Sequence, residues 1–278
     1  MTDVPQSNHV LLRDRRFHYL EWSGPHRDTV VFLHGAGLNG RTWRGVCEHL
    51  RAGYRCIALD LRGHGDSEWA NDLDYSPRSH AGDVSALIAH LGLVRPALVG
   101  MSLGGTVALA HATEHEVRAL VVIDTGPELE STGRAQLVDF FLDPNDVDTF
   151  EGFVNRLHSL YPRRGADELR EGLTHNLIEL PDGRWTWKYD RRQYRFISMD
   201  QRDRWRRETW SDARRLTCPV LVVRGARSRV LTRDTAKALA TRFPAGRFVE
   251  IAGAGHNVQH DQPALLASEI AAFLGAVS

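Results

Sequence analysis

Lysine and cysteine are scarce in this chain, and neither sign of charge is in excess. Its 278 residues include 35 basic and 35 acidic side chains, so the formal net charge is zero, and only Lys188 and Lys237 are lysines. A balanced chain has no overall positive field to attract nucleic acid or an anionic membrane. We therefore expect a small-molecule substrate as the partner, with no nucleic acid and no membrane.

The three cysteines, Cys47, Cys56 and Cys218, lie far apart and show no CxxC spacing. Two of them fall in or beside apolar runs, which is typical of core cysteines. The sequence therefore indicates no disulfide framework and no zinc site, and nothing in it suggests a cofactor.

Long apolar stretches are also missing. No segment approaches the ~20 apolar residues that a membrane-spanning helix requires. The opening residues MTDVPQSNHV lack the basic and apolar regions of a secretory signal. We expect a cytoplasmic, soluble chain, and the sequence leaves its oligomeric state open.

Short apolar runs, by contrast, recur along the chain and alternate with helical patterns. Continuous rather than alternating hydrophobicity is typical of strands buried on both faces. Strand and helix in alternation predict an α/β fold with a mainly parallel central sheet flanked by helices. The predicted strands are 29–33, 56–59, 97–99, 119–123, 220–223 and 247–251, and the helical patterns cover 43–50, 76–91 and 103–111.

The alternation stops near Gly126 and resumes near Thr217. We interpret residues 127–216 as an inserted cap domain and residues 1–126 and 217–278 as the core. Tryptophans are concentrated in this cap, and aromatic side chains there can line the roof of a pocket. Trp43, Trp185 and Trp187 are the candidate substrate contacts; packing of the cap onto the core explains such residues equally well.

The segment Gly100-Met101-Ser102-Leu103-Gly104 lies between a predicted strand and a predicted helix. A sharp turn there would project the Ser102 hydroxyl, and the flanking glycines would let strand and helix approach closely. The GxSxG pattern in this context predicts a nucleophilic serine rather than a serine that only caps a helix.

Two further segments end predicted strands and supply partners for Ser102. His34-Gly35-Ala36-Gly37 is a glycine-rich turn, and the backbone N–H groups of Ala36 and Leu103 are the expected donors to an oxyanion. His34 itself is better explained as a structural hydrogen-bonding residue. Among fourteen histidines, His256 follows a late strand through a glycine-rich loop, which makes it the candidate base. His111 and His115 lie four apart on a helix, but without a third ligand they do not predict a metal site.

At this point the chain resembles the α/β-hydrolase family of the capped, serine-nucleophile type. The strings LHGAG, DLRGHGDS, VGMSLGG, VLVVRGARS and AGAGHNV carry the resemblance. It implies the α/β-hydrolase fold, Ser102 as nucleophile, His256 as base and the oxyanion donors Ala36 and Leu103. It does not imply a substrate, because the superfamily contains many activities.

The chain departs from this family where the catalytic acid is expected. Relatives usually carry Asp at the position of Arg229. An acid orients the histidine and stabilises the imidazolium, whereas an arginine directed at the ring would oppose it. The best replacement is Asp124, which ends the strand 119–123, and the alternative is that Asp124 only caps the turn into the cap. Asp234 and Asp261 have local explanations at the starts of helices, and the direction of Glu250 is open.

The leading hypothesis is a cofactor-independent serine hydrolase, with Ser102, His256 and Asp124 as a triad. An ester, thioester or lactone of a small apolar or aromatic substrate fits best. One alternative is a non-catalytic or slow ligand-binding protein in which Arg229 marks a disabled triad. Others are C–C bond hydrolysis or cofactor-free haloperoxidase-like chemistry in the same pocket.

Overall fold

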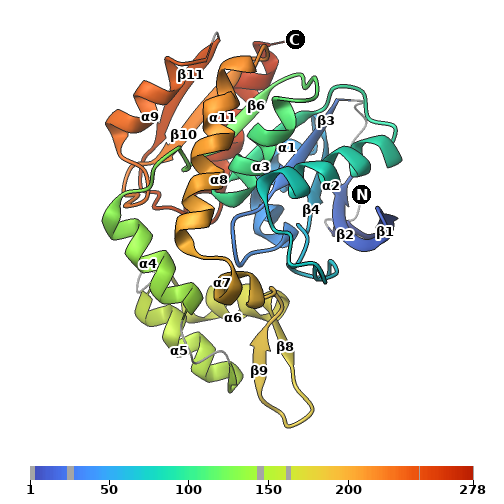
Figure 1. Ribbon diagram of the computed structural model, residues 1–278, viewed down its shortest axis with the longest axis vertical. Helices are drawn as coiled ribbons and strands as arrows, with labels where there is room; N and C mark the ends of the chain where they lie inside the picture. The colour runs from blue at the N-terminus through green and yellow to red at the C-terminus, as the bar shows by residue number, and fades with distance from the viewer. Residues whose placement is uncertain (1–3, 24–27, 143–146, 161–163, 244, 278) are drawn as a thin grey trace.

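The computed structural model describes residues 4–23, 28–142, 147–160, 164–243 and 245–277. The strands of its central sheet are β1 (Gln6–Leu12), β2 (Arg15–Trp22), β3 (Thr29–Leu33), β4 (Arg55–Leu59), β5 (Ala97–Met101), β6 (Leu120–Ile123), β10 (Val220–Gly225) and β11 (Gly246–Ile251). They lie in the order β1-β2-β4-β3-β5-β6-β10-β11 (Figure 1). β2 pairs antiparallel with β1 and β4, and all other pairs are parallel. The predicted mainly parallel α/β fold is confirmed.

The hairpin of β1 and β2 was not predicted. Its turn places Arg13 and Asp14 at φ 49° and 59°. The strands mix polar and apolar residues, because β1 lies at the sheet edge and exposes every position up to His9 at least in part. A search for continuous apolar runs cannot detect strands of this kind.

Helices cover both faces of the sheet (Figure 1). Alternate residues of β3 show the division: Val31 and Leu33 belong to an apolar cluster that includes residues of α2, α3 and α8, whereas Val30 and Phe32 belong to a second cluster that includes residues of α1, α10 and α11. All four of these strand side chains are fully buried. None of the described helices is long and apolar enough to cross a membrane. The bounds are α1 (Arg44–Leu50), α2 (Pro77–His90), α3 (Leu103–Ala112), α8 (Met199–Ser211), α9 (Arg233–Ala240), α10 (Val258–Asp261) and α11 (Pro263–Gly275), with the 3₁₀ turns η1 (Gly40–Trp43) and η2 (Asp212–Arg215).

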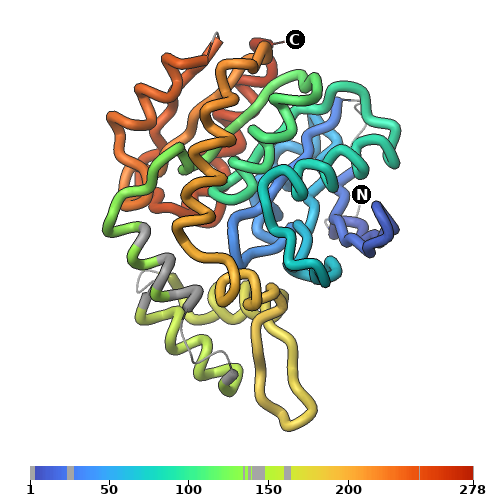
Figure 2. Tube along the Cα trace, in the orientation of Figure 1, coloured from blue at the N-terminus to red at the C-terminus, as the bar shows by residue number. Residues whose placement is uncertain are grey.

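Between β6 and β10 the chain forms a separate group of elements that lies below the main sheet in Figures 1 and 2. Its elements are α4 (Ser131–Leu142), β7 (Val147–Asp148), α5 (Phe150–Leu160), α6 (Ala166–Asn176), β8 (Leu177–Glu179), β9 (Trp185–Trp187) and α7 (Arg192–Phe196). The three strands pair antiparallel in the order β7-β9-β8. Phe153, Leu173 and Trp187 belong to an apolar cluster of this group, which we call the insertion cluster.

The last part of the predicted insertion packs differently. Helix α8 runs back along the main sheet, where it contacts α3 (Figure 1). Trp210 is 6% exposed, and its ring centre lies 6.3 Å from that of Phe243, next to α9. Ala213 and Leu216 join the same core cluster. Within the segment predicted as a cap, 127–216, residues of α5, α6, β8, β9 and α7 form the insertion cluster, whereas residues of α8 and η2 join the main core.

His64 and His111 are buried, and His260 is partly buried. Burial lowers the pKa of His64 to about 3, that of His260 to about 3 and that of His111 to about 4. In the unfolded chain each titrates near ~6.5. Between these values the unfolded state binds the extra protons, so stability is complete above the unfolded pKa and falls as the pH falls towards the folded values.

We therefore expect the free energy of unfolding to be smaller at pH 5 than at pH 7.5, by up to about 1.4 kcal/mol per pH unit for each buried histidine. Urea unfolding at the two pH values measures this. His64→Gln should reduce the difference, and His90→Gln, which changes an exposed residue at the end of α2, should not. Equal stability of the unmodified protein at both pH values would contradict the assignment.

Candidate active site

Ser102 lies between β5 and α3 in a backbone conformation that is rare for residues other than glycine, with φ 52° and ψ −113°. Its N–H donates to the carbonyl of Ile123 at 2.9 Å, so the chain still follows the sheet when it enters the turn. The side chain is partly exposed, and its hydroxyl does not cap α3. A strained turn that leaves a hydroxyl exposed is the geometry that the GxSxG pattern predicts.

The glycines on both sides of Ser102 are needed for this turn. A Cβ atom on Gly100 would lie 2.2 Å from the carbonyl oxygen of Gly104. A Cβ atom on Gly104 would lie 2.1 Å from the carbonyl oxygen of Leu33. Both distances are far inside van der Waals contact, and both neighbours are backbone. The start of α3 can therefore approach β3 and β5 only with glycine at these positions.

His256 and Asp124 are hydrogen-bonded to each other. The distance from His256 Nδ1 to Asp124 Oδ2 is 2.7 Å, and Asp124 is completely buried. Asp124 follows β6 with a φ of 50°, and His256 stands in the loop after β11. The N–H of Arg227, in the loop after β10, donates to the carbonyl of Ala254 at 2.8 Å and so fixes the loop after β11 to the loop after β10. The predicted base and the predicted replacement acid thus lie at the same edge of the sheet.

Ser102 reaches this edge on the adjacent strand, since β5 pairs with β6 and the Ser102 N–H is bonded to the residue before Asp124. Among the described residues, however, no hydrogen bond joins Ser102 Oγ to His256. Such bonds are often long in enzymes without a substrate and shorten when it binds. The ring nitrogen Nε2 of His256 is the one left for Ser102, because Nδ1 is bonded to Asp124.

The turn after β3 passes beside Ser102. A Cβ atom on Gly35 would meet Met101 Sδ at 2.5 Å and Ser102 Cβ at 3.5 Å. In the described part of the chain, the N–H groups of Ala36 and Leu103 donate no hydrogen bond to another residue. Leu103 begins α3, where helix N–H groups have no partner within the helix. Both amides are thus available to an incoming oxygen.

His34 holds this turn in place. Its Nε2 accepts from the N–H of Leu61 at 2.9 Å, and its Nδ1 donates to the carbonyl of Gly35 at 2.8 Å. The ring is completely buried, and burial lowers its pKa. The interpretation of His34 as a structural residue fits these contacts.

Arg229, at the position where the acid was expected, is exposed to solvent. The other acids near the end of the chain have different partners. Glu250 pairs with Arg224 at 2.7 Å, and Asp261 accepts from the N–H of Gly255 at 2.7 Å. Asp234 is an exposed residue in the first turn of α9. Among the described acids, Asp124 is the one hydrogen-bonded to His256.

The three tryptophans proposed as substrate contacts are largely engaged in packing. Trp43 is completely buried in the core, with its ring centre 5.2 Å from that of Phe32, so a substrate cannot reach it without displacing the core. Trp187 packs edge-on against Phe153 within the insertion cluster. Trp185 lies at the margin of this cluster, as does Ala36 from the turn after β3. Ala36 of the predicted oxyanion turn therefore packs against the insertion cluster.

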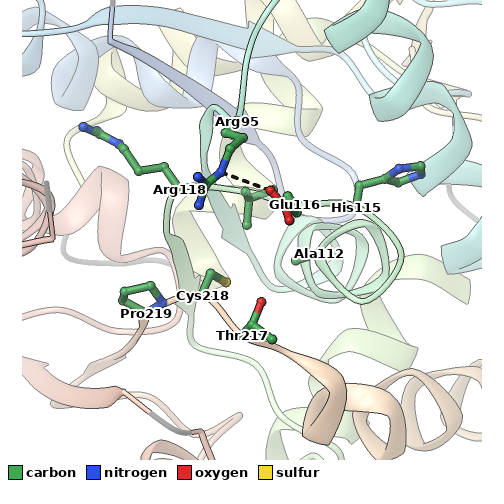
Figure 3. A pocket seen from close by; sticks show the side chains of 9 residues that line it. Arg95, Ala112, His115, Glu116, Arg118, Thr217, Cys218 and Pro219 are labelled. Carbon is green, nitrogen blue, oxygen red and sulfur yellow. Dashed lines mark ion pairs between the residues drawn. The ribbon is translucent and has the colours of Figure 1, made fainter.

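Two surface cavities lie away from Ser102, Asp124 and His256. One, of about 110 Å³, lies near the amino ends of β6 and β10, where Arg95 and Glu116 form an ion pair near Cys218 (Figure 3). The other, of about 440 Å³, lies between α8 and the loop after β4 and includes Trp205 and Phe196. Neither includes Ser102, Asp124 or His256.

The histidine pair does not form a ligand set. The rings of His111 and His115 stack with their centres 4.7 Å apart, and His111 Nδ1 is bonded to Ser85 at 3.0 Å. Within the described residues, one group of three potential metal ligands lies close together, His18, Asp60 and Asp66. His18 is hydrogen-bonded to Asp60, and Asp66 is paired with Lys188.

Known proteins resemble this chain over most of its length. A sequence profile described as "Alpha/beta hydrolase family" matches residues 30–269. The esterase Rv0045c of Mycobacterium tuberculosis is 34% identical over 261 residues, which cover 89% of this chain and 82% of the esterase. A 3-hydroxybutyrate-oligomer hydrolase of Cupriavidus necator is 29% identical over 274 residues, 94% of each protein.

Solved structures show the same likeness. The crystal structure of the Mycobacterium tuberculosis esterase Rv0045c superposes with a TM-score of 0.78 at 28% identity and covers 98% of this chain and 92% of the esterase chain. The crystal structure of an E-2-(acetamidomethylene)succinate hydrolase superposes with a TM-score of 0.85 at 25% identity, over 98% of this chain and 99% of the other.

Proposed function

From the premise that this chain belongs to the alpha/beta hydrolase family, we propose that it is a cofactor-independent serine esterase whose acyl-enzyme forms on Ser102. Esterases, lipases and other hydrolases among its relatives support a carboxylic ester hydrolase. In our proposal His256 is the general base, Asp124 is the acid that orients it, and the N–H groups of Ala36 and Leu103 bind the oxyanion.

The observation that carries the proposal is the 2.7 Å hydrogen bond between His256 Nδ1 and the fully buried Asp124. A buried carboxylate on Nδ1 keeps the proton on that nitrogen and leaves Nε2 unprotonated, ready to accept the serine proton. It also stabilises the imidazolium once the proton has moved. Asp124 therefore supplies what an acid at position 229 supplies in relatives.

The reaction then follows four steps. His256 Nε2 takes the proton of Ser102 as Oγ attacks the carbonyl carbon, and the two backbone amides stabilise the negative oxygen. The tetrahedral intermediate collapses, and His256 gives its proton to the departing alcohol or thiol. Water, deprotonated by the same ring nitrogen, attacks the acyl-enzyme. The second intermediate releases the acid, and the proton returns to Ser102.

We further propose an ester, thioester or lactone of a small apolar or aromatic acid as the substrate. The support is the insertion cluster, which packs aromatic side chains against Ala36, so that apolar groups lie beside the proposed oxyanion site. One relative is named as a hydrolase of 3-hydroxybutyrate oligomers. The exposed side chain of Arg229 also supports the proposal, because an arginine directed at His256 would oppose the imidazolium.

A panel of p-nitrophenyl esters with acetyl, butyryl, octanoyl and hemisuccinyl groups tests this function in buffer with and without EDTA. We expect turnover of the neutral esters, slower turnover of the anionic hemisuccinate, and no effect of EDTA. Thioester and lactone analogues extend the panel. A folded protein that turns over none of these compounds would contradict the proposed function.

A further inference from the structure

The loop after β10, residues 226–231, contains Ser228 immediately before the exposed Arg229. Ser228 is buried, 8% exposed, and its Oγ lies 2.5 Å from Asp124 Oδ2. The same carboxylate oxygen accepts the hydrogen bond from His256 Nδ1. Ser228 and His256 therefore meet at one atom of the proposed catalytic acid, and no pattern in the sequence singled out this serine.

The direction of the hydrogen bond follows from the other contact of the hydroxyl. The N–H of Val230 donates to Ser228 Oγ at 3.1 Å, so the hydroxyl oxygen is an acceptor there. An ionised carboxylate can only accept. The hydroxyl proton is thus directed at Asp124, in a charge-assisted hydrogen bond.

Contacts that do not involve Asp124 hold Ser228 in this position. Its N–H donates to the carbonyl of Gly225 at 2.9 Å. The buried guanidinium of Arg224 donates to the carbonyls of Ser228 at 2.9 Å and Leu231 at 2.7 Å. Because Arg224 is also bonded to Glu250, the loop is tied to both β10 and β11. The hydroxyl is therefore already in place before any proton moves at the site.

With the N–H of Gly225 at 3.3 Å from Oδ1, Asp124 accepts three hydrogen bonds while fully buried. Donors to the charged form of a buried carboxylate stabilise it and fix the plane of the carboxylate. A fixed plane in turn fixes the ring of His256. Without Ser228 the carboxylate would keep two of its three hydrogen bonds, its plane would be less firmly fixed, and it would attract the Nδ1 proton more strongly.

We propose that Ser228 is a positioning residue of the proposed triad: through its hydrogen bond to Asp124 it fixes the orientation of His256 and moderates the stabilisation of the imidazolium. The loop that has lost the usual acid thus retains a catalytic role by supporting the acid that replaces it. This inference rests on the proposed function.

Loss of the Ser228 hydroxyl should shift the pH profile of activity, and the charged groups near Asp124 do not provide another explanation for such a shift. Arg224 is paired with Glu250, and Asp261 with Arg164 at 3.2 Å. Arg227 and Arg229 are exposed. Within the described residues, Ser228 and His256 are the side chains that form hydrogen bonds with Asp124.

The test compares Ser228→Ala with the unmodified protein and with Arg229→Ala, a control at the adjacent exposed position. In Ser228→Ala we expect kcat to fall about 10- to 100-fold, as for loss of a hydrogen bond to a charged group, with KM nearly unchanged. The acidic limb of the kcat/KM profile should move to higher pH, because a stronger attraction by Asp124 favours the imidazolium. Arg229→Ala should change neither kcat nor the position of the acidic limb. Ser228→Thr retains the hydroxyl, so its acidic limb should stay at the pH found for the unmodified protein.

If Ser228→Ala does not fold, Ser228→Cys replaces it, since a thiol of similar size is only a weak donor; the same shift is expected. Ser228→Ala or Ser228→Cys with an unchanged pH profile and kcat would overturn the inference while the proposed function stands. Undiminished turnover in Asp124→Asn would instead overturn the function on which the inference rests.

Discussion

Replacement of Ser102 by alanine is expected to lower kcat for ester hydrolysis by about 10⁴-fold or more, the effect seen when a serine nucleophile is removed from a triad. The reason is that no other group in the proposed mechanism can form the acyl-enzyme. The measurement is the initial rate of p-nitrophenyl butyrate hydrolysis, normalised to folded protein. The thermal midpoint of Ser102→Ala should not fall, because alanine at φ 52° is no more strained than serine at the same place.

A second candidate activity makes this variant decisive. The His256–Asp124 pair is hydrogen-bonded, whereas in the described residues Ser102 is not bonded to it. A pair of this kind also suits a base that acts without a covalent intermediate, as in cofactor-free haloperoxidase-like chemistry. Activity that survives in Ser102→Ala would favour that alternative and contradict the acyl-enzyme.

Replacement of Asp124 by asparagine is expected to lower kcat by about 10³- to 10⁴-fold. Asparagine is nearly isosteric but neutral, so the imidazolium loses its stabilising charge. Its amide group can also present N–H donors to His256 and select the wrong tautomer. Steady-state kinetics on the same ester measures the loss, with circular dichroism to verify the fold.

Asp234→Asn is the matched control, because it makes the same chemical change at an exposed acid of α9. We expect its kcat to equal that of the unmodified protein. If Asp124→Asn and Asp234→Asn were equally active, Asp124 would be a residue of the turn after β6 and not part of a triad.

The buried parallel strands could be predicted closely from the sequence. The run 29–33 coincides with β3, and the run 220–223 falls within β10. Such strands are buried on both faces, so their residues are almost all apolar and bounded by turns. The edge hairpin of β1 and β2 lacks this signal and was missed. The packing of α8 was also missed, because a helix with many charges can cover either the core or an insertion.

The candidate site also has features that the sequence could predict and features that it could not. The strained turn at Ser102 could be predicted because the strand-turn-helix context restricts what a GxSxG sequence can do, and the hydrogen bond of Asp124 to His256 because Asp124 ends the strand next to that turn; the catalytic roles of these residues stay proposals. The sequence could not show that Arg229 is exposed or that Ser228 contacts Asp124, since both depend on side-chain direction within one loop. The burial of Trp43 likewise depends on which way η1 turns the ring.

Labelling with a fluorophosphonate, mapped by mass spectrometry, tests the central claim most directly, namely that Ser102 is a nucleophile activated by His256 and Asp124. We predict a single phosphonylated residue, Ser102, with labelling at least about 10²-fold slower in Asp124→Asn, the lower end of what a general base contributes. Absence of labelling in the folded unmodified protein, or equal rates in the two proteins, would contradict the account.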